Sequence, residues 1–222
     1  MGKVQRCKGA IIVIMKQKSL REPMVGEKQY LSDLVYNREQ VEERARVCAE
    51  EIRKKMQEID YLVCVMQGAW FWANLLSEKL NYGKRVDVEL SFYHRLQVSL
   101  ESDQQLESLN WTNSRILIVE NIVATGRTLA YILATLNAQG PKQIGVCTMF
   151  NKPGVRHPEF VDVNSYLINI GFTLSKEKFV VGYGNRGLPP LPDELRYLEN
   201  IYRVKQEPES YRQFTAWGNK DV

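Results

Sequence analysis

The sequence RILIVENIVATGRT, residues 115–128, has the pattern of a buried strand that runs through a short loop into a helix. Its first part, RILIVE (115–120), is an apolar run of the length expected for a strand buried on both faces. The sequence GRTLAYILATLNAQG (126–140) has apolar residues at helical spacing, and Gly140-Pro141 is a typical helix stop. The stretch therefore predicts a strand-loop-helix unit of an α/β fold.

The loop of this unit has the residues of an anion-binding turn. Thr125 and Thr128 bring two hydroxyl groups, Gly126 is small, and Arg127 adds a positive charge. Backbone N–H groups in the first turn of a helix, at the positive end of its dipole, attract phosphate groups. We therefore predict that these four residues bind a phosphate monoester; the alternative is an ordinary strand-to-helix turn.

The rest of the chain alternates between strand and helix patterns. The segment NREQVEERARVCAEEIRKKM (37–56) has apolar or small residues at helical spacing, with Asn37 and Gln40 placed as its capping box. Strands that alternate with helices predict a parallel sheet covered on both faces, in which ligands bind beyond the carboxyl ends of the strands. The other predicted elements are the helix AWFWANLLSEKL (69–80) and the strands YLVCVM (61–66), RVDVELSFY (85–93), QIGVCTMF (143–150), KFVVGYG (178–184) and LENIYRV (198–204).

Composition and charge exclude several classes of protein. The 222 residues are 44% hydrophobic and 25% charged, as in a globular protein with a sizeable core. A net charge of +4 without a run of Lys and Arg argues against a nucleic-acid partner, and no apolar stretch has membrane-spanning length. The two histidines, His94 and His157, are assigned neither a metal nor a catalytic proton. The cysteines are scattered without a C-x-x-C pair, which predicts neither a disulfide framework nor a zinc site; they are Cys7, Cys48, Cys64 and Cys147.

The two ends of the chain differ in composition from its centre. Residues 1–21 contain basic residues and no acidic one, a composition that resembles a mitochondrial presequence; the alternative is an ordinary basic arm of a cytoplasmic protein. The last residues are polar apart from Phe214 and Trp217, which we expect to pack onto a surface. The sequence therefore divides into a basic N-terminal extension (1–32), a central domain (33–205) and a C-terminal tail (206–222).

Five segments, in order along the chain, resemble motifs of the purine phosphoribosyltransferases of the hypoxanthine-guanine type. ILIVENIVATGRT resembles their phosphoribosyl-pyrophosphate motif, YLVCVMQGAWFWANLL their first motif and FNKPGVR their purine segment. KFVVGYG is similar to the hood strand over the base, and ELRYLENI has an arginine where the family places one near pyrophosphate. The resemblance covers residues 33–205 and implies a type I phosphoribosyltransferase-like fold, a twisted and mainly parallel sheet with helices on both faces and a small hood.

The resemblance also implies roles for individual residues. In the family, a lysine bonds the 6-oxo group of the purine, an aromatic ring stacks on the base, and a tight turn after the first strand approaches pyrophosphate. The phosphate-binding residues are the four of the predicted turn. The other implied contacts are Glu120 and Asn121 for the ribose, Lys152, Phe179 and Val180 for the purine, and Gln67, Gly68 and Arg196 for the pyrophosphate.

The chain departs from the family where negative charge is expected. Ala124 replaces the aspartate that serves as general base or hydrogen-bonds N7 of the purine, and Asn121 replaces one member of the acidic pair on the ribose. Arg186 stands where the family has an aspartate that helps to hold magnesium. Losing a general base alone costs about 10²- to 10⁴-fold in rate, and the other two changes remove electrostatic stabilisation as well. We therefore expect no catalytic residue and no cofactor; Mg²⁺ is expected only if the protein is active.

Three functions follow from this pattern. The first is a catalytically silent phosphoribosyltransferase-fold protein that acts as a structural or regulatory subunit. Its partners would be other protein subunits, in a homo- or heterodimer or a larger assembly. Such a protein could still bind a phosphate or a purine nucleotide. The second is an active hypoxanthine/guanine phosphoribosyltransferase of purine salvage, which would need Glu120 to replace the missing base at Ala124. The third is a nucleotide-sensing regulator that uses the turn without chemistry.

Overall fold

The computed structural model describes residues 19–89, 106–186 and 191–205, and beyond these ranges only the backbone of four short strands. Most of the basic N-terminal stretch and the C-terminal tail with its two aromatic residues therefore lie outside the described residues. The short strands form two antiparallel pairs, β1 (Gln5–Cys7) with β2 (Ala10–Ile12) and β6 (Phe92–Tyr93) with β7 (Gln97–Val98).

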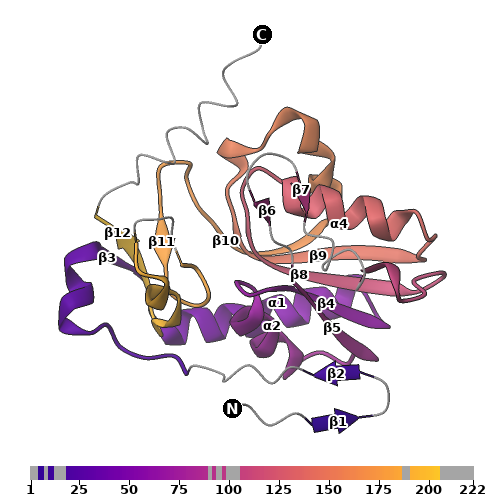
Figure 1. Ribbon diagram of the computed structural model, residues 1–222, viewed down its shortest axis with the longest axis horizontal. Coiled ribbons are helices and arrows are strands. Elements are labelled where there is room, and N and C mark those ends of the chain that lie inside the picture. The colour runs from indigo at the N-terminus through magenta and orange to yellow at the C-terminus, as the bar shows by residue number, and fades with distance from the viewer. Residues whose placement is uncertain are drawn as a thin grey trace.

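A five-stranded parallel sheet forms the centre of the molecule (Figure 1). Parallel neighbours need crossover connections, which place helices on the faces of the sheet and bury its strands on both sides. The middle strand, β8, is accordingly buried over most of its length. In order across the sheet the strands are β10 (Leu167–Thr173), β9 (Gln143–Asn151), β8 (Arg115–Val123), β4 (Tyr61–Met66) and β5 (Lys84–Glu89).

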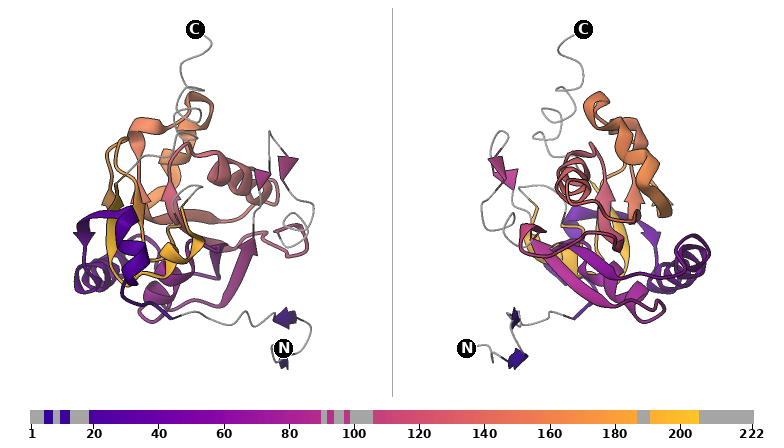
Figure 2. Two further views of the ribbon diagram at one scale, coloured as in Figure 1. Left: turned by 60° about the vertical axis from the view of Figure 1, so that its left-hand side comes forward. Right: turned by 90° about the vertical axis from the view of Figure 1, so that its right-hand side faces the viewer.

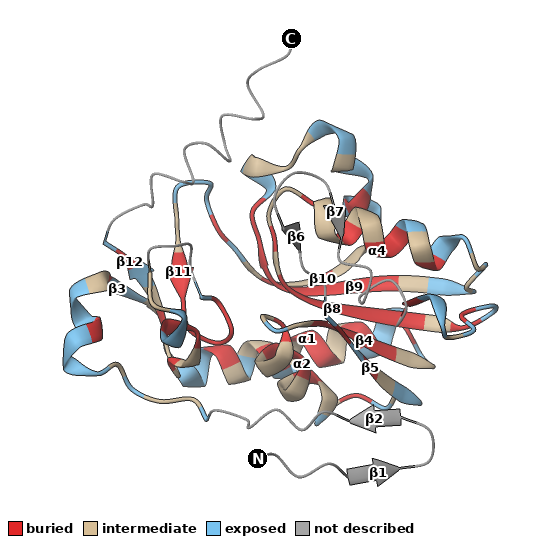
Figure 3. Cartoon of the chain, in the orientation of Figure 1, coloured by how far each residue is buried: buried red, intermediate tan, exposed pale blue. Residues whose placement is uncertain are grey.

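Helices pack against both faces of this sheet, as predicted. The helices α1 (Arg38–Lys55) and α2 (Trp70–Ser77) bury their apolar sides in one core cluster. The helix α4 (Arg127–Asn137) belongs to a second cluster on the other face, and Figures 1 and 2 show it across the sheet from α1. Buried residues accordingly line the strands and the inner sides of the helices (Figure 3). The predicted cap of α1 is confirmed, because Asn37 and Gln40 exchange backbone and side-chain hydrogen bonds of 2.8 and 2.9 Å.

A small antiparallel sheet forms the hood, with the strand order β11 (Val180–Val181), β12 (Ile201–Val204) and β3 (Leu31–Tyr36). Arg21 joins the hood, since its N–H donates to the carbonyl of Tyr197 and its carbonyl accepts from the N–H of Glu199, both at 2.9 Å. The predicted division between residues 32 and 33 falls inside β3, and the assignment of three domains stays a prediction. Four 3-10 helices complete the described structure: η1 (Val25–Tyr30), η2 (Pro153–Val155), η3 (Pro158–Tyr166) and η4 (Asp193–Tyr197).

Several predicted elements differ in extent or place. Strand β8 continues beyond the predicted end at residue 120 because Ile122 and Val123 still pair with β9. The segments 178–184 and 198–204 supply strands of the hood rather than of the central sheet, as the family resemblance implied for the first of them. The strands β3 and β10 were not predicted, since Ser32 and Asp33 interrupt the apolar residues of β3, and β10 contains a buried asparagine and a glycine.

The described helices are all too short or too polar to cross a membrane. The three cysteines whose side chains are described, Cys48, Cys64 and Cys147, are buried and free, which agrees with the expectation that they form no disulfide framework.

Candidate phosphate-binding site

The predicted phosphate turn lies between the end of β8 and the start of α4. Gly126 is the N-cap residue of α4 and has a φ of +92°, a left-handed conformation that glycine adopts without strain. A Cβ atom at this position would lie 3.1 Å from both Arg156 Cδ and Phe160 Cβ. The turn is therefore shaped by the conformation of Gly126 and by close packing from the segment after β9.

Arg156, which the sequence reasoning did not single out, supports this turn from behind. Its Nη1 donates to the carbonyl of Ala124 at 2.6 Å and its Nη2 donates to Asn151 Oδ1 at 2.7 Å. The N–H of His157 also donates to the carbonyl of Thr125 at 3.1 Å. Arg156 is the last residue of the FNKPGVR segment, so the resemblance marked its neighbourhood but not its role. Its guanidinium thus brings a positive charge to the carbonyl side of the turn.

The turn encloses a cavity of about 90 Å³, lined by Glu120 and residues 122–129. Arg127, one of the lining residues, has a buried Nε with no hydrogen-bond partner among the described residues. The Nε of Arg156, which supports the turn, is likewise buried without such a partner. A buried N–H group without a partner is costly, and an anion in the cavity is one acceptor that would satisfy such groups. Two guanidinium groups and the start of a helix thus make the cavity suited to a small anion.

Glu120, predicted to contact the ribose, is a buried carboxyl group at the edge of this cavity. Burial raises its pKa to about 7, although backbone N–H groups of Asn121 and Ile122 that bond the carboxylate act in the opposite direction. The bond from the Asn121 N–H to Glu120 Oε1 is 2.7 Å long. At neutral pH the group is therefore close to half protonated, and it brings less negative charge to the site than an exposed glutamate would.

Asn121, the other predicted ribose contact, bonds to the hood. Its Nδ2 donates to Asn185 Oδ1 at 3.0 Å, and Asn185 Nδ2 donates to the carbonyl of Gly182 at 3.0 Å. Both asparagine side chains are buried, and Asn121 Oδ1 has no partner among the described residues. No local sequence signal predicts this contact, because the two asparagines are 64 residues apart.

The three predicted pyrophosphate contacts also come together. Arg196 Nη1 donates to Gln67 Oε1 at 2.7 Å, and its Nη2 donates to Asp193 Oδ1 at 2.7 Å. A Cβ atom on Gly68 would lie 2.9 Å from Asn121 Nδ2, so the turn after β4 packs directly on that side chain. The Arg196 guanidinium is thus already bonded within the chain.

Arg186, at the position where the family has its metal-binding aspartate, lies at the surface. Its side chain is 57% exposed, and its Nη1 is 3.6 Å from Asp193 Oδ1, the carboxylate that also bonds Arg196. An arginine in place of an aspartate makes this position two charges more positive than the family resemblance implies. The exposure and the neighbouring Asp193 reduce that effect through solvent screening and ion pairing.

The predicted purine contacts Lys152 and Phe179 lie side by side. Lys152 Nζ is 4.2 Å from the centroid of the Phe179 ring and donates to the carbonyl of Lys178 at 3.2 Å. The Lys152 side chain is 2% exposed, and the third predicted contact, Val180, begins β11 directly after Phe179. The three residues are therefore neighbours in space, with the ammonium group over the ring face.

The residues present do not fit the magnesium ion that the family resemblance implies. Magnesium requires oxygen ligands, usually one or two carboxylates together with phosphate oxygens. The resemblance expects a carboxylate that contacts the ribose at position 121 and one that helps to hold the metal at position 186. This chain has an amide, Asn121, at the first position and a guanidinium, Arg186, at the second. Within the described ranges, no three His, Cys, Asp or Glu side chains gather as a metal-binding group.

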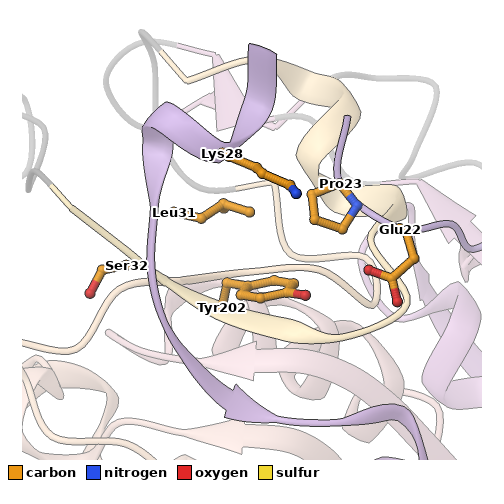
Figure 4. A pocket seen from close by; sticks show the side chains of 6 residues that line it. All are labelled: Glu22, Pro23, Lys28, Leu31, Ser32 and Tyr202. Atoms are coloured by element: carbon orange, nitrogen blue, oxygen red, sulfur yellow. The ribbon is translucent and has the colours of Figure 1, made fainter. Parts of the chain in front are cut away.

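A larger cavity, of about 500 Å³, lies on the hood and contains none of the predicted site residues. Figure 4 shows the Tyr202 ring at its base, with Pro23 and Glu22 on one side, Leu31 and Ser32 on the other, and Lys28 above. Four large apolar side chains are exposed among the described residues. Three of them belong to the segment before β3 or to β3 itself, namely Met24, Val25 and Leu34. These three residues are close in sequence to residues that line the cavity, and exposed apolar side chains are candidates for contact with other chains.

Comparison with known proteins agrees with the fold. A hypoxanthine phosphoribosyltransferase of Buchnera aphidicola is 28% identical over 177 residues, which cover 77% of this chain and 94% of that protein. A hypoxanthine-guanine phosphoribosyltransferase of Mycobacterium avium is 36% identical over 98 residues, 44% of this chain and 42% of that protein.

Solved structures show the same fold. A hypoxanthine-guanine phosphoribosyltransferase of Bacillus anthracis superposes with a TM-score of 0.65 at 23% identity, over 78% of this chain and 98% of that one. A hypoxanthine phosphoribosyltransferase of Staphylococcus aureus gives a TM-score of 0.66 at 21% identity, over 86% and 99%. The family model of the phosphoribosyl transferase domain matches residues 33–185, and the chain therefore belongs to the phosphoribosyl transferase domain family.

Proposed function

We propose that this phosphoribosyltransferase-fold protein binds a phosphate group or a purine nucleotide at the turn before α4, has lost transferase catalysis, and serves as a structural or regulatory subunit of a larger protein assembly. The proposal rests on a difference between the anion-binding residues of the site and the residues at its expected carboxylate positions. The turn keeps the groups that hold an anion, whereas Ala124, Asn121 and Arg186 stand where the resemblance expects carboxylates.

The loss of catalysis is argued from the charges that the transfer reaction needs. Forming the bond between ribose and purine builds positive charge on the sugar and negative charge on the departing pyrophosphate. Carboxylates and magnesium stabilise these charges, at several kcal/mol for each such group. With an alanine, an amide and an exposed guanidinium at the three positions, the chain supplies anion affinity but not this stabilisation.

An enzymatic assay tests this part of the proposal. Purified protein is incubated with phosphoribosyl pyrophosphate, Mg²⁺ and hypoxanthine or guanine, with the hypoxanthine phosphoribosyltransferase of Escherichia coli, 41% identical over 69 residues, assayed in parallel. We expect turnover at least about 10²- to 10⁴-fold below the control, the cost of one missing general base. Turnover within tenfold of the control would contradict the proposal.

One observation favours the alternative, an active hypoxanthine/guanine phosphoribosyltransferase of purine salvage. Glu120 is a buried carboxyl group with a pKa raised to about 7, which is the range of an effective general base. If turnover is found, the variant Glu120→Gln decides whether Glu120 has replaced the missing base. A loss of at least 10²-fold in kcat would assign that role to Glu120.

The subunit role is supported by the exposed apolar side chains beside the hood cavity. Native mass spectrometry of the protein purified from its own cells measures its partners directly. Stable co-purifying chains support the subunit role, and a free monomer contradicts it. The mitochondrial location suggested by the basic N-terminus belongs to the same proposal, and imaging a C-terminally tagged full-length chain tests it against the cytoplasmic alternative.

A nucleotide-sensing role would use the same turn. Calorimetry with purine monophosphates tests it, because a regulator must bind its nucleotide at cellular concentrations. Absence of binding at millimolar ligand would remove both this role and the nucleotide-binding part of the proposal.

A further inference from the structure

Building on the proposed function, we infer that the site accepts a phosphate monoester but excludes the pyrophosphate of phosphoribosyl pyrophosphate, because the chain's own groups occupy that part of the site. We call residues 122–128 with Arg156 the phosphate half. We call Gln67, Gly68, Asn121, Asn185 and Arg196 the pyrophosphate half, after the roles that the resemblance implies.

Residues 182–185, after β11, form a turn that we call the hood turn. Its backbone lies directly on the turn after β4. A Cβ atom on Gly184 would be 1.9 Å from the carbonyl oxygen of Gly68, so the two backbones are in contact and no ligand group fits between them. The hood turn is held in place by its own backbone bonds: the N–H of Gly184 donates to the carbonyl of Arg196 at 2.8 Å, and that of Tyr183 to the carbonyl of Leu198 at 3.0 Å. The residues that make this contact are thus held in the hydrogen-bonded structure of the hood.

The side chains of Asn121 and Asn185 close the same space from the other side. Their 3.0 Å hydrogen bond joins the end of β8 to the hood turn, and the two side chains are 4% and 6% exposed. The Asn121 amide also packs on Gly68. A pyrophosphate that entered here would have to break this buried bond and separate the hood from β8, leaving buried amide groups without partners.

Arg196 contributes no open cationic group to this half. Its two terminal nitrogens donate to Gln67 and Asp193 at 2.7 Å each, and its side chain is 8% exposed. Its Nε is buried without a partner among the described residues, so it is not presented at a surface that a ligand can reach. The arginine that the family places near pyrophosphate therefore serves here as an internal link between the turn after β4 and η4.

The phosphate half is different, because a cavity lies within it. Its cavity of about 90 Å³ corresponds to roughly three water molecules, each with a share of about 30 Å³ of liquid volume. The cavity is lined by Arg127, whose Nε–H is buried without a partner among the described residues, and by the residues that begin α4. The ligand class is therefore a phosphate monoester, such as the 5′-phosphate of a ribose or of a nucleotide.

A matched pair of ligands tests the inference on the whole chain. Ribose 5-phosphate and phosphoribosyl pyrophosphate share the 5′-phosphate and differ by the pyrophosphate on C1. Isothermal titration calorimetry, with and without Mg²⁺, measures both dissociation constants. We expect ribose 5-phosphate to bind at least tenfold more tightly than phosphoribosyl pyrophosphate under both conditions.

The variant Asn185→Ala sharpens the test by removing the bridge to Asn121. We expect its affinity for phosphoribosyl pyrophosphate to rise at least fivefold, while its affinity for ribose 5-phosphate stays within twofold and so confirms that the variant is folded. Asn137→Ala is the matched control, since Asn137 is an exposed asparagine at the end of α4, and it should change neither affinity.

The outcomes separate this inference from the proposed function. If phosphoribosyl pyrophosphate binds as tightly as ribose 5-phosphate or more tightly, the inference is wrong and the phosphate-binding turn stands. If neither ligand binds at millimolar concentration, the phosphate-binding part of the proposed function fails, and the inference fails with it.

Discussion

The two halves of the site hold their shape by different means. In the phosphate half, the main bond from Arg156 is to a backbone carbonyl, and the shape depends on the conformation of Gly126. In the pyrophosphate half, most of the bonds join side chains, such as Asn121 with Asn185 and Arg196 with Gln67. Anion affinity that is built into the backbone survives substitutions, whereas chemistry that depends on carboxylate side chains is lost with them.

The largest expected effect comes from breaking the backbone contact of the pyrophosphate half. Gly184 has a φ of +91°, and a methyl group there would meet the carbonyl oxygen of Gly68 at 1.9 Å. We expect Gly184→Ala to lower the free energy of unfolding by about 3 to 5 kcal/mol, measured by urea denaturation. Gly140→Ala is the control, because Gly140 has a φ of +68° and open space around it, so its cost should be only about 1 kcal/mol.

The second effect concerns Glu120, where the two halves meet. Its pKa is raised from 4.5 to about 7, so the folded state favours the protonated form. The resulting stabilisation is complete below pH 4.5 and is lost as the pH rises toward 7. Since one pKa unit corresponds to about 1.4 kcal/mol, the total is roughly 3 kcal/mol.

Glu120→Gln keeps an oxygen for the Asn121 N–H and does not titrate. We therefore expect the free energy of unfolding of the wild type, but not that of the variant, to fall by this amount between pH 4.5 and 7. Sulfate affinity should fall between pH 6 and 8 in the wild type only, since sulfate keeps its charge in this range. Parallel pH dependences in the two proteins would show that Glu120 does not have the raised pKa.

The smallest of the three effects comes from the support of the phosphate half. Arg156→Leu leaves the carbonyl of Ala124 and the side chain of Asn151 without their donors, and we expect a loss of about 2 kcal/mol in unfolding free energy. Sulfate affinity should fall at least tenfold by calorimetry. Arg156→Lys keeps the charge, and if it behaves like the wild type, then charge rather than the two hydrogen bonds shapes the turn.

The sequence was sufficient for the parts of the fold that depend on local pattern. The helix α1 with its cap at Asn37, the apolar strand β4 and the glycine turn before α4 were all predicted, because periodicity and capping residues are local signals. The strand β3, in which Ser32 and Asp33 interrupt the apolar residues, has no such signal and is defined by its pairing with β12, more than 160 residues away in sequence.

The residues of the site can likewise be divided into those with a local sequence signal and those without one. The turn residues Thr125 to Thr128 carry their chemistry in their own spacing, and the structure places them at the start of α4 as predicted. The Asn121–Asn185 bond and the Arg196–Gln67 bond join residues 64 and 129 positions apart, so they depend on how the hood sits over β4 and β8. No spacing rule applies to such contacts, which explains why the closed pyrophosphate half was not predicted.

The bond from Arg156 to the carbonyl of Ala124 has a consequence for how this protein could change. Every amino acid has a main-chain carbonyl, so the anchor is indifferent to which side chain stands at position 124. A lineage can therefore gain or lose an acidic group there in one step while the loop keeps its form. The same property makes position 124 a favourable place for an engineer to install an aspartate, with the Arg156 guanidinium already nearby as a counter-ion.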